Sequence, residues 1–333
     1  MELAVIGAGS WGTALAHLLS LKGNTVHFWA HRESVAQFIN VEHRNPDYLS
    51  NFSLSENIIA TSSIKEACQY AEAVVVVTPS KVMREIAQNI KPYINETTPI
   101  IICSKGAEAN TGKLPIEIFA DELKNPSRLA VLSGPNHAEE VVQCLPAATV
   151  VASIDQTCAQ FFQELFACDY FRTYASLDVL GVELCAAFKN IIAIAVGISY
   201  GLGFGDNTAA LLMTRGIAEM SRLVSAIGGE AITCMGLAGT GDLIATCTSQ
   251  HSRNRRFGED VAKGKTLEDF QGKTHMVVEG ALACKTIQTL ADRYEVDLPI
   301  TQKVRAIVWE GSDTIQAAEE LADRPLTTEF RGL

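Results

Sequence analysis

Short apolar runs alternate with helical patterns through the first half of the chain. Apolar and β-branched residues dominate the segments 3–6, 25–30, 57–61, 73–78, 99–104, 128–133 and 147–152. Segments 73–77 and 100–102 are apolar at every position, which is typical of strands covered by helices on both faces. Strands that alternate with helices predict a parallel sheet, with these two segments near its centre.

The pattern changes near residue 177. Four long segments then repeat apolar residues at the 3.6-residue period of a helix, at residues 177–199, 208–227, 278–294 and 300–309. No further strand is predicted. At roughly 100 to 200 residues per domain, the length also favours two domains. We therefore expect an α/β chain with a sheet domain at residues 1–176 and an all-helical domain at residues 177–333.

Composition and charge exclude several classes of protein. Hydrophobic residues make up 47% and charged residues 20%, a balance typical of globular chains. Lys and Arg minus Asp and Glu give 27 − 38 = −11, a charge that repels nucleic acid, so no nucleic-acid partner is expected. The longest unbroken apolar stretch, residues 191–198, is far shorter than the roughly 18 residues that span a bilayer, so no integral membrane segment is expected. The N-terminus lacks the basic start of a signal peptide.

The nine cysteines are odd in number and scattered along the chain. None forms a CxxC pair or lies at zinc-binding spacing from a histidine, so we expect no metal site. Such cysteines are typical of reduced and mostly buried thiols, which predicts a cytoplasmic location.

A glycine-rich turn follows the first predicted strand. Residues 7–12 read GAGSWG and open an apolar helix that ends near Gly23. In this setting Gly7 allows a tight turn, Gly9 lets the backbone approach a pyrophosphate, and Gly12 lets the helix pack on the strand. The N–H groups of the helix N-terminus face the phosphates. The sequence therefore predicts a dinucleotide-binding site of the Rossmann type in the sheet domain.

The residues after the second strand bear on which dinucleotide binds. An NAD-preferring fold usually has Asp or Glu there, to hold the ribose 2′-hydroxyl. This chain has His31 and Arg32, which suit a 2′-phosphate, followed by Glu33. We expect NADP(H) to be preferred and NAD(H) to be possible, since a shift of one or two residues would bring Glu33 into the place of the acid.

Polar residues interrupt two apolar segments of the helical half. Lys189, followed by Asn190, either reaches solvent or is held beside a pocket, where burial adapts a lysine to proton transfer. Asp242 and Thr246 are four residues apart on one face of a helix that follows the glycines of residues 236–241. Asp242 can cap that helix, and capping does not exclude catalysis.

Further segments carry candidate ligand contacts. Residues 252–256 read SRNRR, the densest basic cluster of the chain, which is either a phosphate clamp or a solvated surface turn. Lys105 follows one buried strand, and SGPNH at residues 133–137 follows another. Ligands of open α/β sheets bind at the carboxyl ends of the strands, which favours both positions.

Seven segments together resemble one family. They are GAGSWGT at residues 7–13, SKG at 104–106, SGPNHAEEV at 133–141, GVELCAAFKNIIAIA at 181–195, GLAGTGDLIATCT at 236–248, SRNRRFG at 252–258 and VVEG at 277–280. The chain resembles the bacterial NAD(P)-dependent glycerol-3-phosphate dehydrogenases nearly from end to end. The resemblance implies a Rossmann-type cofactor domain followed by a helical substrate-binding and catalytic domain like that of 6-phosphogluconate dehydrogenase.

The resemblance also implies an activity and its residues. The activity is reversible reduction of dihydroxyacetone phosphate to sn-glycerol 3-phosphate for glycerophospholipid synthesis, in a cytoplasmic homodimer. Lys189 corresponds to the proton-transfer lysine, and the other catalytic residues implied are Lys105, Asp242 and Thr246. The implied substrate residues are Lys105, Gly134, Asn136, Lys189, Asp242, Ser252, Arg253 and Asn254. The implied cofactor residues are Gly7, Gly9, Ser10, Trp11, Gly12, His31, Arg32, Lys105, Ala138, Arg253, Val277 and Glu279.

One departure and two alternatives accompany this interpretation. Asn136 and His137 stand where the family more often has a small hydroxyl or amide residue followed by an aromatic one. A 6-phosphogluconate or 3-hydroxyisobutyrate type of dehydrogenase has the same two-domain build, but the segments SRNRRFG and GTGDLIATC speak against it. A dinucleotide-binding sensor without turnover is the other alternative, which Lys105, Lys189 and Asp242 disfavour.

Overall fold

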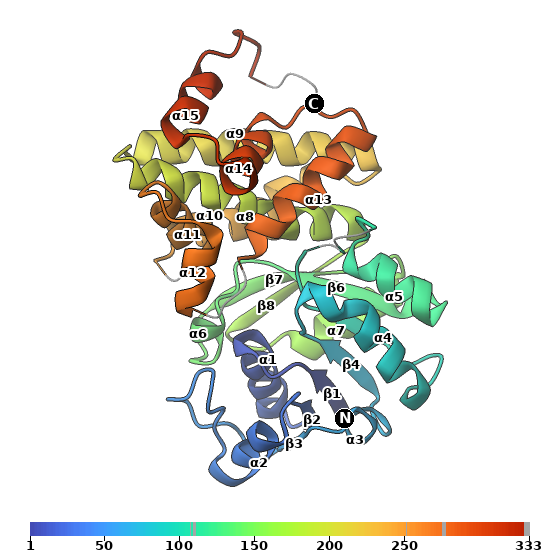
Figure 1. Cartoon of the computed structure of the whole chain (residues 1–333). Helices are drawn as coiled ribbons and strands as arrows, with labels where there is room; N and C mark the ends of the chain where they lie inside the picture. The colour runs from blue at the N-terminus through green and yellow to red at the C-terminus, as the bar shows by residue number, and fades with distance from the viewer. Residues whose placement is uncertain (107, 109–110, 251, 275–277, 330–333) are drawn as a thin grey trace. The chain divides into compact units, whose positions relative to one another are not determined.

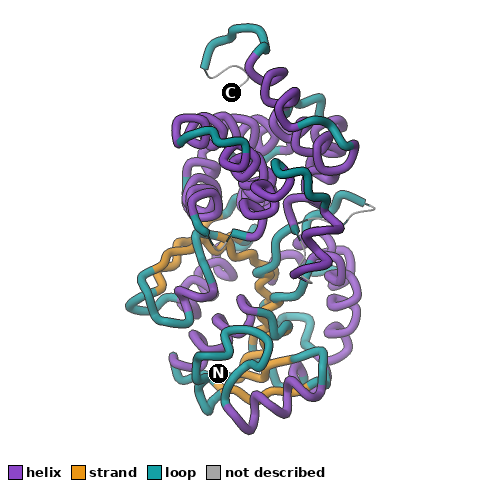
Figure 2. Tube along the Cα trace, turned by 60° about the vertical axis from the view of Figure 1, so that its left-hand side comes forward, coloured by secondary structure: helices purple, strands orange, loops and turns teal. Residues whose placement is uncertain are grey.

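The computed structural model describes the chain except for residues 107, 109–110, 251, 275–277 and 330–333 (Figure 1). Two compact units are present: the first comprises Met1–Lys105 and Lys113–Val179, and the second comprises Gly106–Gly112 and Leu180–Leu333. All strands of the described chain belong to the first unit, and the second unit is helical (Figure 2). The sequence predicted one boundary after residue 176. In the structure the short segment Gly106–Gly112 also groups with the helical unit.

The first unit is built on one eight-stranded sheet with the strand order β3-β2-β1-β4-β5-β6-β7-β8. The strands are β1 (Glu2–Ile6), β2 (Thr25–Trp29), β3 (Ile58–Thr61), β4 (Ala73–Val76), β5 (Ile100–Ile102), β6 (Leu129–Ser133), β7 (Ala147–Ala152) and β8 (Phe171–Ser176). Strands β1 to β6 are parallel. The strand order reverses between β1 and β4, and ligands of open α/β sheets bind at the carboxyl ends of strands at such a point.

Helices cover this sheet and bury its apolar strands. They are α1 (Ser10–Leu21), α2 (Glu33–Glu42), α3 (Ile64–Cys68), α4 (Met83–Ile90), α5 (Pro115–Leu123), α6 (Ala138–Val141) and α7 (Gln156–Phe166), with short 3-10 turns η1 (Ser80–Val82), η2 (Lys91–Tyr93) and η3 (Pro126–Arg128). β4 and β5 are buried at every position, as their unbroken apolar pattern predicted. Val5, Val75 and Ile101 join α1 and α7 in one hydrophobic core.

The last two strands depart from the sequence prediction. β7 runs antiparallel to β6, with Ser133 opposite Val150, so the sheet is not parallel throughout. Between them lies the four-residue helix α6, which is too short to carry the chain back across the sheet, so β7 starts at the edge where β6 ends. The prediction also missed β8, whose first four residues alternate between buried and exposed. An edge strand of that kind lacks the continuous apolar run of β4.

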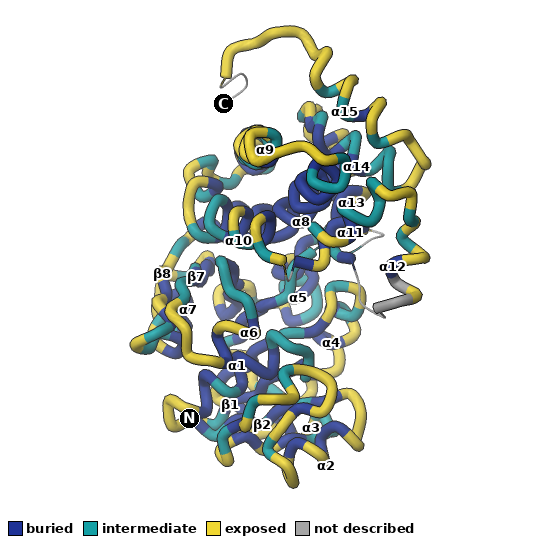
Figure 3. The backbone as a smooth tube through the Cα atoms, turned by 90° about the vertical axis from the view of Figure 1, so that its left-hand side faces the viewer, coloured by how far each residue is buried: buried dark blue, intermediate teal, exposed yellow. Residues whose placement is uncertain are grey.

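The second unit consists of helices and turns in the part of the chain that the structure describes. The helices are α8 (Val179–Gly201), α9 (Asp206–Ile227), α10 (Asp242–Thr248), α11 (Arg253–Val261), α12 (Leu267–Thr274), α13 (Glu279–Arg293), α14 (Pro299–Glu310) and α15 (Thr314–Ala322), with short turns η4 (Ala231–Met235) and η5 (Leu237–Gly241). The four predicted helical segments correspond to α8, α9, α13 and α14. By length and composition alone, α8 could cross a membrane, but 89% of its most apolar window is buried inside the fold (Figure 3).

Candidate active site

A buried ion pair joins two helices of the second unit. Lys189 of α8 donates from Nζ to Oδ1 of Asp242 and, at 2.7 Å, to Oγ1 of Thr246, both on α10. The side chains of Lys189 and Asp242 are only 7% and 4% exposed. Of the two alternatives for Lys189, the structure therefore shows the buried one. Because a buried charge needs a partner and hydrogen bonds, this arrangement fixes the position of Nζ.

The glycine-rich segment before α10 places Asp242. Leu237–Gly241 forms a π-helical turn that leads directly into α10. A Cβ on Gly239 would lie 2.1 Å from the carbonyl oxygen of Cys234, so only glycine allows this close approach. Gly241 occupies the N-cap position, and Asp242 is the first residue of the helix. Thr246 donates from Oγ1 to the carbonyl oxygen of Asp242 at 2.6 Å, which orients its hydroxyl to accept from Lys189.

An amide network holds α8 at the residue after Lys189. Asn254 of α11 donates from Nδ2 to Oδ1 of Asn190 at 2.9 Å, and its Oδ1 accepts from the N–H of Gly280 at 2.9 Å. Asn254, which the resemblance assigned to the substrate, thus links α8, α11 and α13 in this structure. This network supports the helix that carries Lys189, because it satisfies buried amides that would otherwise destabilise the fold.

The basic segment of residues 252–256 divides between the surface and the interior. Ser252 is the N-cap of α11, where its side chain accepts from the N–H of Arg255 at 3.3 Å. Arg255 pairs with Glu259 at 3.0 Å and lies over the ring of Tyr200 at 4.7 Å from its centroid. Arg253 is exposed and makes no ion pair with the described residues. Arg256 is exposed as well and makes no ion pair with the described residues either, so these two guanidiniums are the ones in this group open to an anionic ligand.

The glycine turn of the first unit has the geometry of a dinucleotide-binding loop. Gly7 has a φ of +123°, and a Cβ on Gly12 would lie 1.8 Å from the carbonyl oxygen of Gly7. The fold itself therefore requires both glycines. A Cβ on Gly9 would meet nothing within 4 Å, so packing does not explain this one. Because Gly9 is the N-cap of α1, the open space over it fits a pyrophosphate at a helix N-terminus.

Asn45 braces the same turn, and sequence analysis missed it. Its buried side chain donates from Nδ2 to the carbonyl oxygen of Ala8 at 3.0 Å and to Oγ1 of Thr13 at 2.8 Å. Its Oδ1 accepts from the N–H of Asp47 at 3.0 Å. Asn45 follows Ala8 by 37 residues and stands in an irregular segment, so no local pattern could have marked it.

The residues after β2 have separate partners. Arg32 forms an ion pair with Asp47, and its side chain is 61% exposed. The carboxylate of Glu33 accepts from Gln37 at 3.0 Å and from the hydroxyl of Ser62. Arg32 and Glu33 are therefore each bound to another side chain, and His31, Arg32 and Glu33 are all exposed after β2.

Lys105 follows β5 at the carboxyl edge of the sheet. It is half-buried, and it is the last residue before the segment that groups with the helical unit. Its neighbour Ser104 donates from Oγ to the carbonyl oxygen of Thr78 at 2.6 Å, which ties the ends of β4 and β5 together. Lys105 thus extends from a fixed piece of backbone.

Gly134 and Asn136 follow β6 at the same edge. A Cβ on Gly134 would lie 2.9 Å from the carbonyl oxygen of Ala148, so β7 requires this glycine. Asn136 donates from Nδ2 to the same carbonyl at 3.0 Å, which turns its Oδ1 the other way. That Oδ1 and the Oγ of Ser133 are buried and have no hydrogen-bond partner within the described chain. Buried polar atoms are nearly always bonded, so both atoms favour a ligand at this edge.

The remaining predicted contacts stand at helix starts. Ser10 and Trp11 begin α1, Ala138 begins α6 and Glu279 begins α13, whereas Val277 lies outside the described residues.

No group of three metal-ligating side chains occurs among the described residues. All nine cysteines are free, and seven of them are buried. Burial raises the pKa of Cys247, next to Thr246, to about 12.

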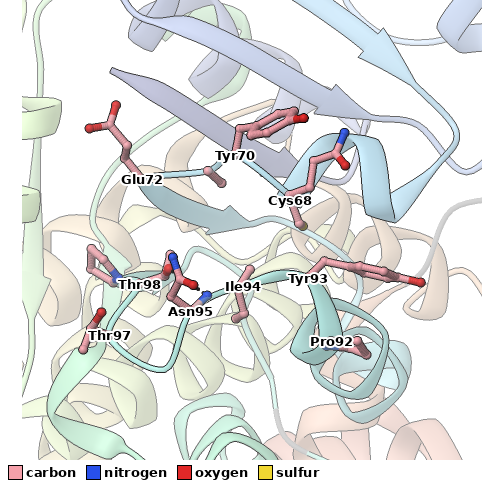
Figure 4. A pocket seen from close by; sticks show the side chains of 12 residues that line it. Cys68, Tyr70, Glu72, Pro92, Tyr93, Ile94, Asn95, Thr97 and Thr98 are labelled. Atoms are coloured by element: carbon pink, nitrogen blue, oxygen red, sulfur yellow. Dashed lines mark hydrogen bonds between the residues drawn. The ribbon is translucent and has the colours of Figure 1, made fainter.

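A hollow of about 600 Å³ in the first unit lies away from these residues (Figure 4). It is lined by residues 68–72 and by residues between 92 and 99, which precede β4 and β5. That position is the amino edge of the two strands, whereas Thr78 and Lys105 follow their carboxyl ends. The hollow therefore does not belong to the candidate cofactor site.

Family models match both parts of the chain. The model for the N-terminus of NAD-dependent glycerol-3-phosphate dehydrogenase matches residues 2–159, and the model for its C-terminus matches residues 178–319. Together they cover the glycine turn and the ion pair of Lys189.

Individual relatives agree with the family models. The glycerol-3-phosphate dehydrogenase (NAD(P)+) of Shouchella clausii is 43% identical over 335 residues, which are 100% of this chain and 98% of the relative. The enzyme of that name from Bacillus subtilis is 42% identical over 100% of this chain and 97% of the relative. The crystal structure of glycerol-3-phosphate dehydrogenase from Coxiella burnetii is 39% identical and covers 97% of this chain and 98% of that one, with a TM-score of 0.92. The chain belongs to the NAD-dependent glycerol-3-phosphate dehydrogenase family.

Proposed function

We propose that this chain reversibly reduces dihydroxyacetone phosphate to sn-glycerol 3-phosphate with NAD(P)H, a reaction that supplies glycerophospholipid synthesis. The observation that carries the proposal is the buried Lys189, which is bonded to Asp242 and Thr246. The glycine turn with open space over Gly9 supports dinucleotide binding by the same chain. The dinucleotide supplies the hydride when it is bound.

Lys189 is the proton donor in this proposal. As hydride reaches the ketone carbon, negative charge develops on the ketone oxygen, and the ammonium of Lys189 stabilises that charge and gives the oxygen a proton. In the reverse direction the amine takes the proton from the alcohol. Asp242 and Thr246 hold Nζ in place, so little reorganisation is needed during the reaction.

The proposal divides the other roles between the domains at residues 1–176 and 177–333. Lys105 acts near the reacting carbon, and Arg253 binds the substrate phosphate as a planar, charged donor. The further substrate contacts are Gly134, Asn136, Ser252 and Asn254. The cofactor contacts are Gly7, Gly9, Ser10, Trp11, Gly12, His31, Arg32, Lys105, Ala138, Arg253, Val277 and Glu279. The family resemblance also supports a homodimer in the cytoplasm.

Replacing Lys189 by alanine tests the central role. We expect Lys189→Ala to lower kcat at least about 100-fold, which is the lower end of what a positioned general acid contributes. NADPH oxidation with dihydroxyacetone phosphate, followed by absorbance, measures this change. The dissociation constant for NADPH should stay close to the wild-type value, because the glycine turn is unaltered. A variant that keeps more than about a tenth of the wild-type kcat contradicts the role.

Two further proteins make this test specific. Lys265 also pairs with an aspartate, Asp260 at 2.7 Å, but near the surface, so Lys265→Ala should keep the wild-type kcat. Because Lys189→Ala leaves Asp242 buried without its cation, the double variant Lys189→Met with Asp242→Asn removes the charge imbalance. This double variant should fold and be as inactive as Lys189→Ala. A wild-type protein without turnover would overturn the proposed activity itself.

Cofactor preference is tested at Arg32. In this proposal the guanidinium of Arg32, which is exposed and also pairs with Asp47, binds the 2′-phosphate of NADPH, which NADH lacks. We expect Arg32→Ala to lower the ratio of kcat/KM for NADPH to kcat/KM for NADH about tenfold, equivalent to one charge-assisted contact. Arg172→Ala, an exposed arginine on β8, is the matched control and should leave the ratio unchanged. Equal ratios in both variants would remove Arg32 from cofactor selection.

A further inference from the structure

Thr78 lies at the point where the strand order of the sheet reverses. It is two residues past the end of β4, whose last residue, Val76, pairs with Ile6 directly before the glycine turn. β1 and β4 are the neighbours on either side of the reversal. The carboxyl ends of strands at such a point form the crevice in which open α/β sheets bind their ligands.

The side chain of Thr78 is held by its surroundings, but its hydroxyl is not satisfied by them. A Cβ on Gly7 would lie 3.2 Å from Cγ2 of Thr78, so the methyl group packs toward the glycine turn. The carbonyl oxygen of Thr78 accepts from Ser104 at 2.6 Å, which fixes the backbone. Thr78 is 5% exposed, and its Oγ1 is buried with no hydrogen-bond partner within the described chain.

A buried hydroxyl without a partner costs about 1–3 kcal/mol, so folded proteins rarely leave one in this state. At a ligand-binding edge, a bound ligand is the partner that recovers this free energy. Ser133 and Asn136 show the same lack of a partner after β6, which extends the set of unsatisfied atoms along the carboxyl edge.

We infer that the hydroxyl of Thr78 hydrogen-bonds the nicotinamide half of the bound dinucleotide. The inference rests on the proposed function. β2, with His31 and Arg32 at its end, lies on one side of β1, and β4 lies on the other. An adenosine half bound at the end of β2 therefore leaves the nicotinamide half over β4. The ribose hydroxyls and the carboxamide of that half both donate and accept hydrogen bonds, so a threonine hydroxyl can pair with either.

The test is the isosteric variant Thr78→Val, which keeps the methyl group and replaces the hydroxyl by a second methyl group. Fluorescence titration of the purified full chain without substrate should give a dissociation constant for NADPH that is about three- to tenfold higher than in wild type, the value of one hydrogen bond. ADP, which lacks the nicotinamide half, should bind both proteins equally. The free variant should melt no lower than wild type, because the lost hydroxyl has no partner in the free protein.

Thr173→Val is the matched control. Oγ1 of Thr173 is also buried without a partner in the described chain, but Thr173 belongs to β8, four strands away from β4. It should leave the dissociation constant for NADPH unchanged. Thr78→Ser, which restores a hydroxyl, should bind NADPH nearly as tightly as wild type. If Thr78→Val does not fold, Thr78→Ala replaces it, and the alanine variant should bind weakly where the serine variant binds tightly.

The outcomes separate this inference from the proposed function. A wild-type protein that binds NADPH, with Thr78→Val within twofold of it, overturns the role of Thr78 and leaves the enzyme proposal intact. Equal weakening of NADPH and ADP overturns it as well, because the effect would then not be specific to the nicotinamide half. A wild-type protein that binds no dinucleotide overturns the proposed function first.

Discussion

Glu219 is a carboxylate buried completely inside the helical unit. From α9 it accepts from the N–H groups of Ile300 at 2.7 Å and Thr301 at 3.3 Å, and from the Thr301 hydroxyl at 3.2 Å. These N–H groups belong to the first turn of α14, where a helix offers no acceptors of its own. Burial raises the pKa of Glu219 to about 7, although these bonds and the charge of Arg222 oppose the shift. Glu219 thus caps α14 from another helix.

A pH dependence of stability follows from this residue. Its pKa in the folded state, about 7, is above the ordinary value of 4.5, so the folded state binds the proton more tightly than the unfolded state does. The stabilisation by this proton is fully present below about pH 4.5 and is lost as the pH rises to about 7. We expect the free energy of unfolding to fall more steeply in wild type than in Glu219→Gln between these pH values, by up to about 1.4 kcal/mol per pH unit.

Denaturant unfolding at a series of pH values measures this difference. Glu320→Gln is the control, because Glu320 is an exposed carboxylate whose pKa is lowered by hydrogen bonds from Lys303 and Gln316. Its titration falls below the range in which Glu219 acts, so it should keep the wild-type slope. Equal slopes in wild type and Glu219→Gln would show that Glu219 does not carry this proton.

Single residues could be predicted from the sequence when a pattern surrounded them. Lys189 interrupts an apolar helix and Asp242 follows a run of glycines, so both were recognised. No local pattern indicated that they lie together, because 53 positions separate them; only the family resemblance grouped Asp242 with the catalytic lysine. The roles of Asn45 and Glu219 were not predicted for the same reason. Each bonds backbone N–H or carbonyl groups of a distant segment, and a single polar residue has no periodic pattern in the sequence.

At the scale of elements, the contact between α8 and α11 depends on glycines on both helices. A Cβ on Gly258 of α11 would lie 2.2 Å from the carbonyl oxygen of Ile194, and a Cβ on Gly197 of α8 would lie 2.0 Å from that of Arg255. The two helix backbones therefore touch directly. This contact sets the distance between the helix that carries Lys189 and the helix that begins with Arg253.

Gly258→Ala should separate the two helices. A methyl group cannot fit at 2.2 Å from a backbone oxygen, so α11 must shift, and overpacking of this kind costs about 1–3 kcal/mol. We expect the free energy of unfolding to fall by that amount and the KM for dihydroxyacetone phosphate to rise, because Arg253 moves with α11. Urea unfolding and steady-state kinetics measure the two effects.

Gly272→Ala provides the comparison for this prediction. Gly272 lies in α12, and a Cβ there would meet nothing within 4 Å. Alanine at an exposed helical position should therefore raise stability by up to about 1 kcal/mol. If both alanine variants had the same effect, helix propensity and not the α8–α11 contact would explain the result at Gly258.

Most elements could be predicted because their apolar period is local. Unbroken apolar runs predicted β4 and β5, and the 3.6-residue period predicted α8, α9, α13 and α14. The direction of β7 was beyond such reasoning, since a strand has the same pattern whether it runs parallel or antiparallel. β8, which reads FRTYAS, was missed because Arg172, Thr173 and Ser176 leave it without an apolar run, whereas the other edge strand, β3, reads IIAT.

At the scale of the whole molecule, the candidate site residues are divided between two units of different architecture. The glycine turn belongs to the sheet unit, and the pair of Lys189 and Asp242 belongs to the helical unit. The change of period near residue 177 predicted two architectures, but not that Gly106–Gly112 groups with the later one. With a net charge of −11, the chain as a whole repels an anionic substrate, so we expect binding to depend on local cations such as the proposed contact Arg253.

The length and apolarity of α8 also affect how the chain is made. Its mean hydropathy of 1.9 over its most apolar window is that of a membrane anchor. α8 leaves the ribosome before α9, α10, α11 and α13, which contact it in the folded chain, have been synthesised. Lys189, the eleventh of its 23 residues, is near its middle. A lysine there costs about 2.5–3.5 kcal/mol for insertion into a bilayer. We therefore expect Lys189, the proposed proton donor, also to keep the nascent helix from being inserted into a membrane as an anchor.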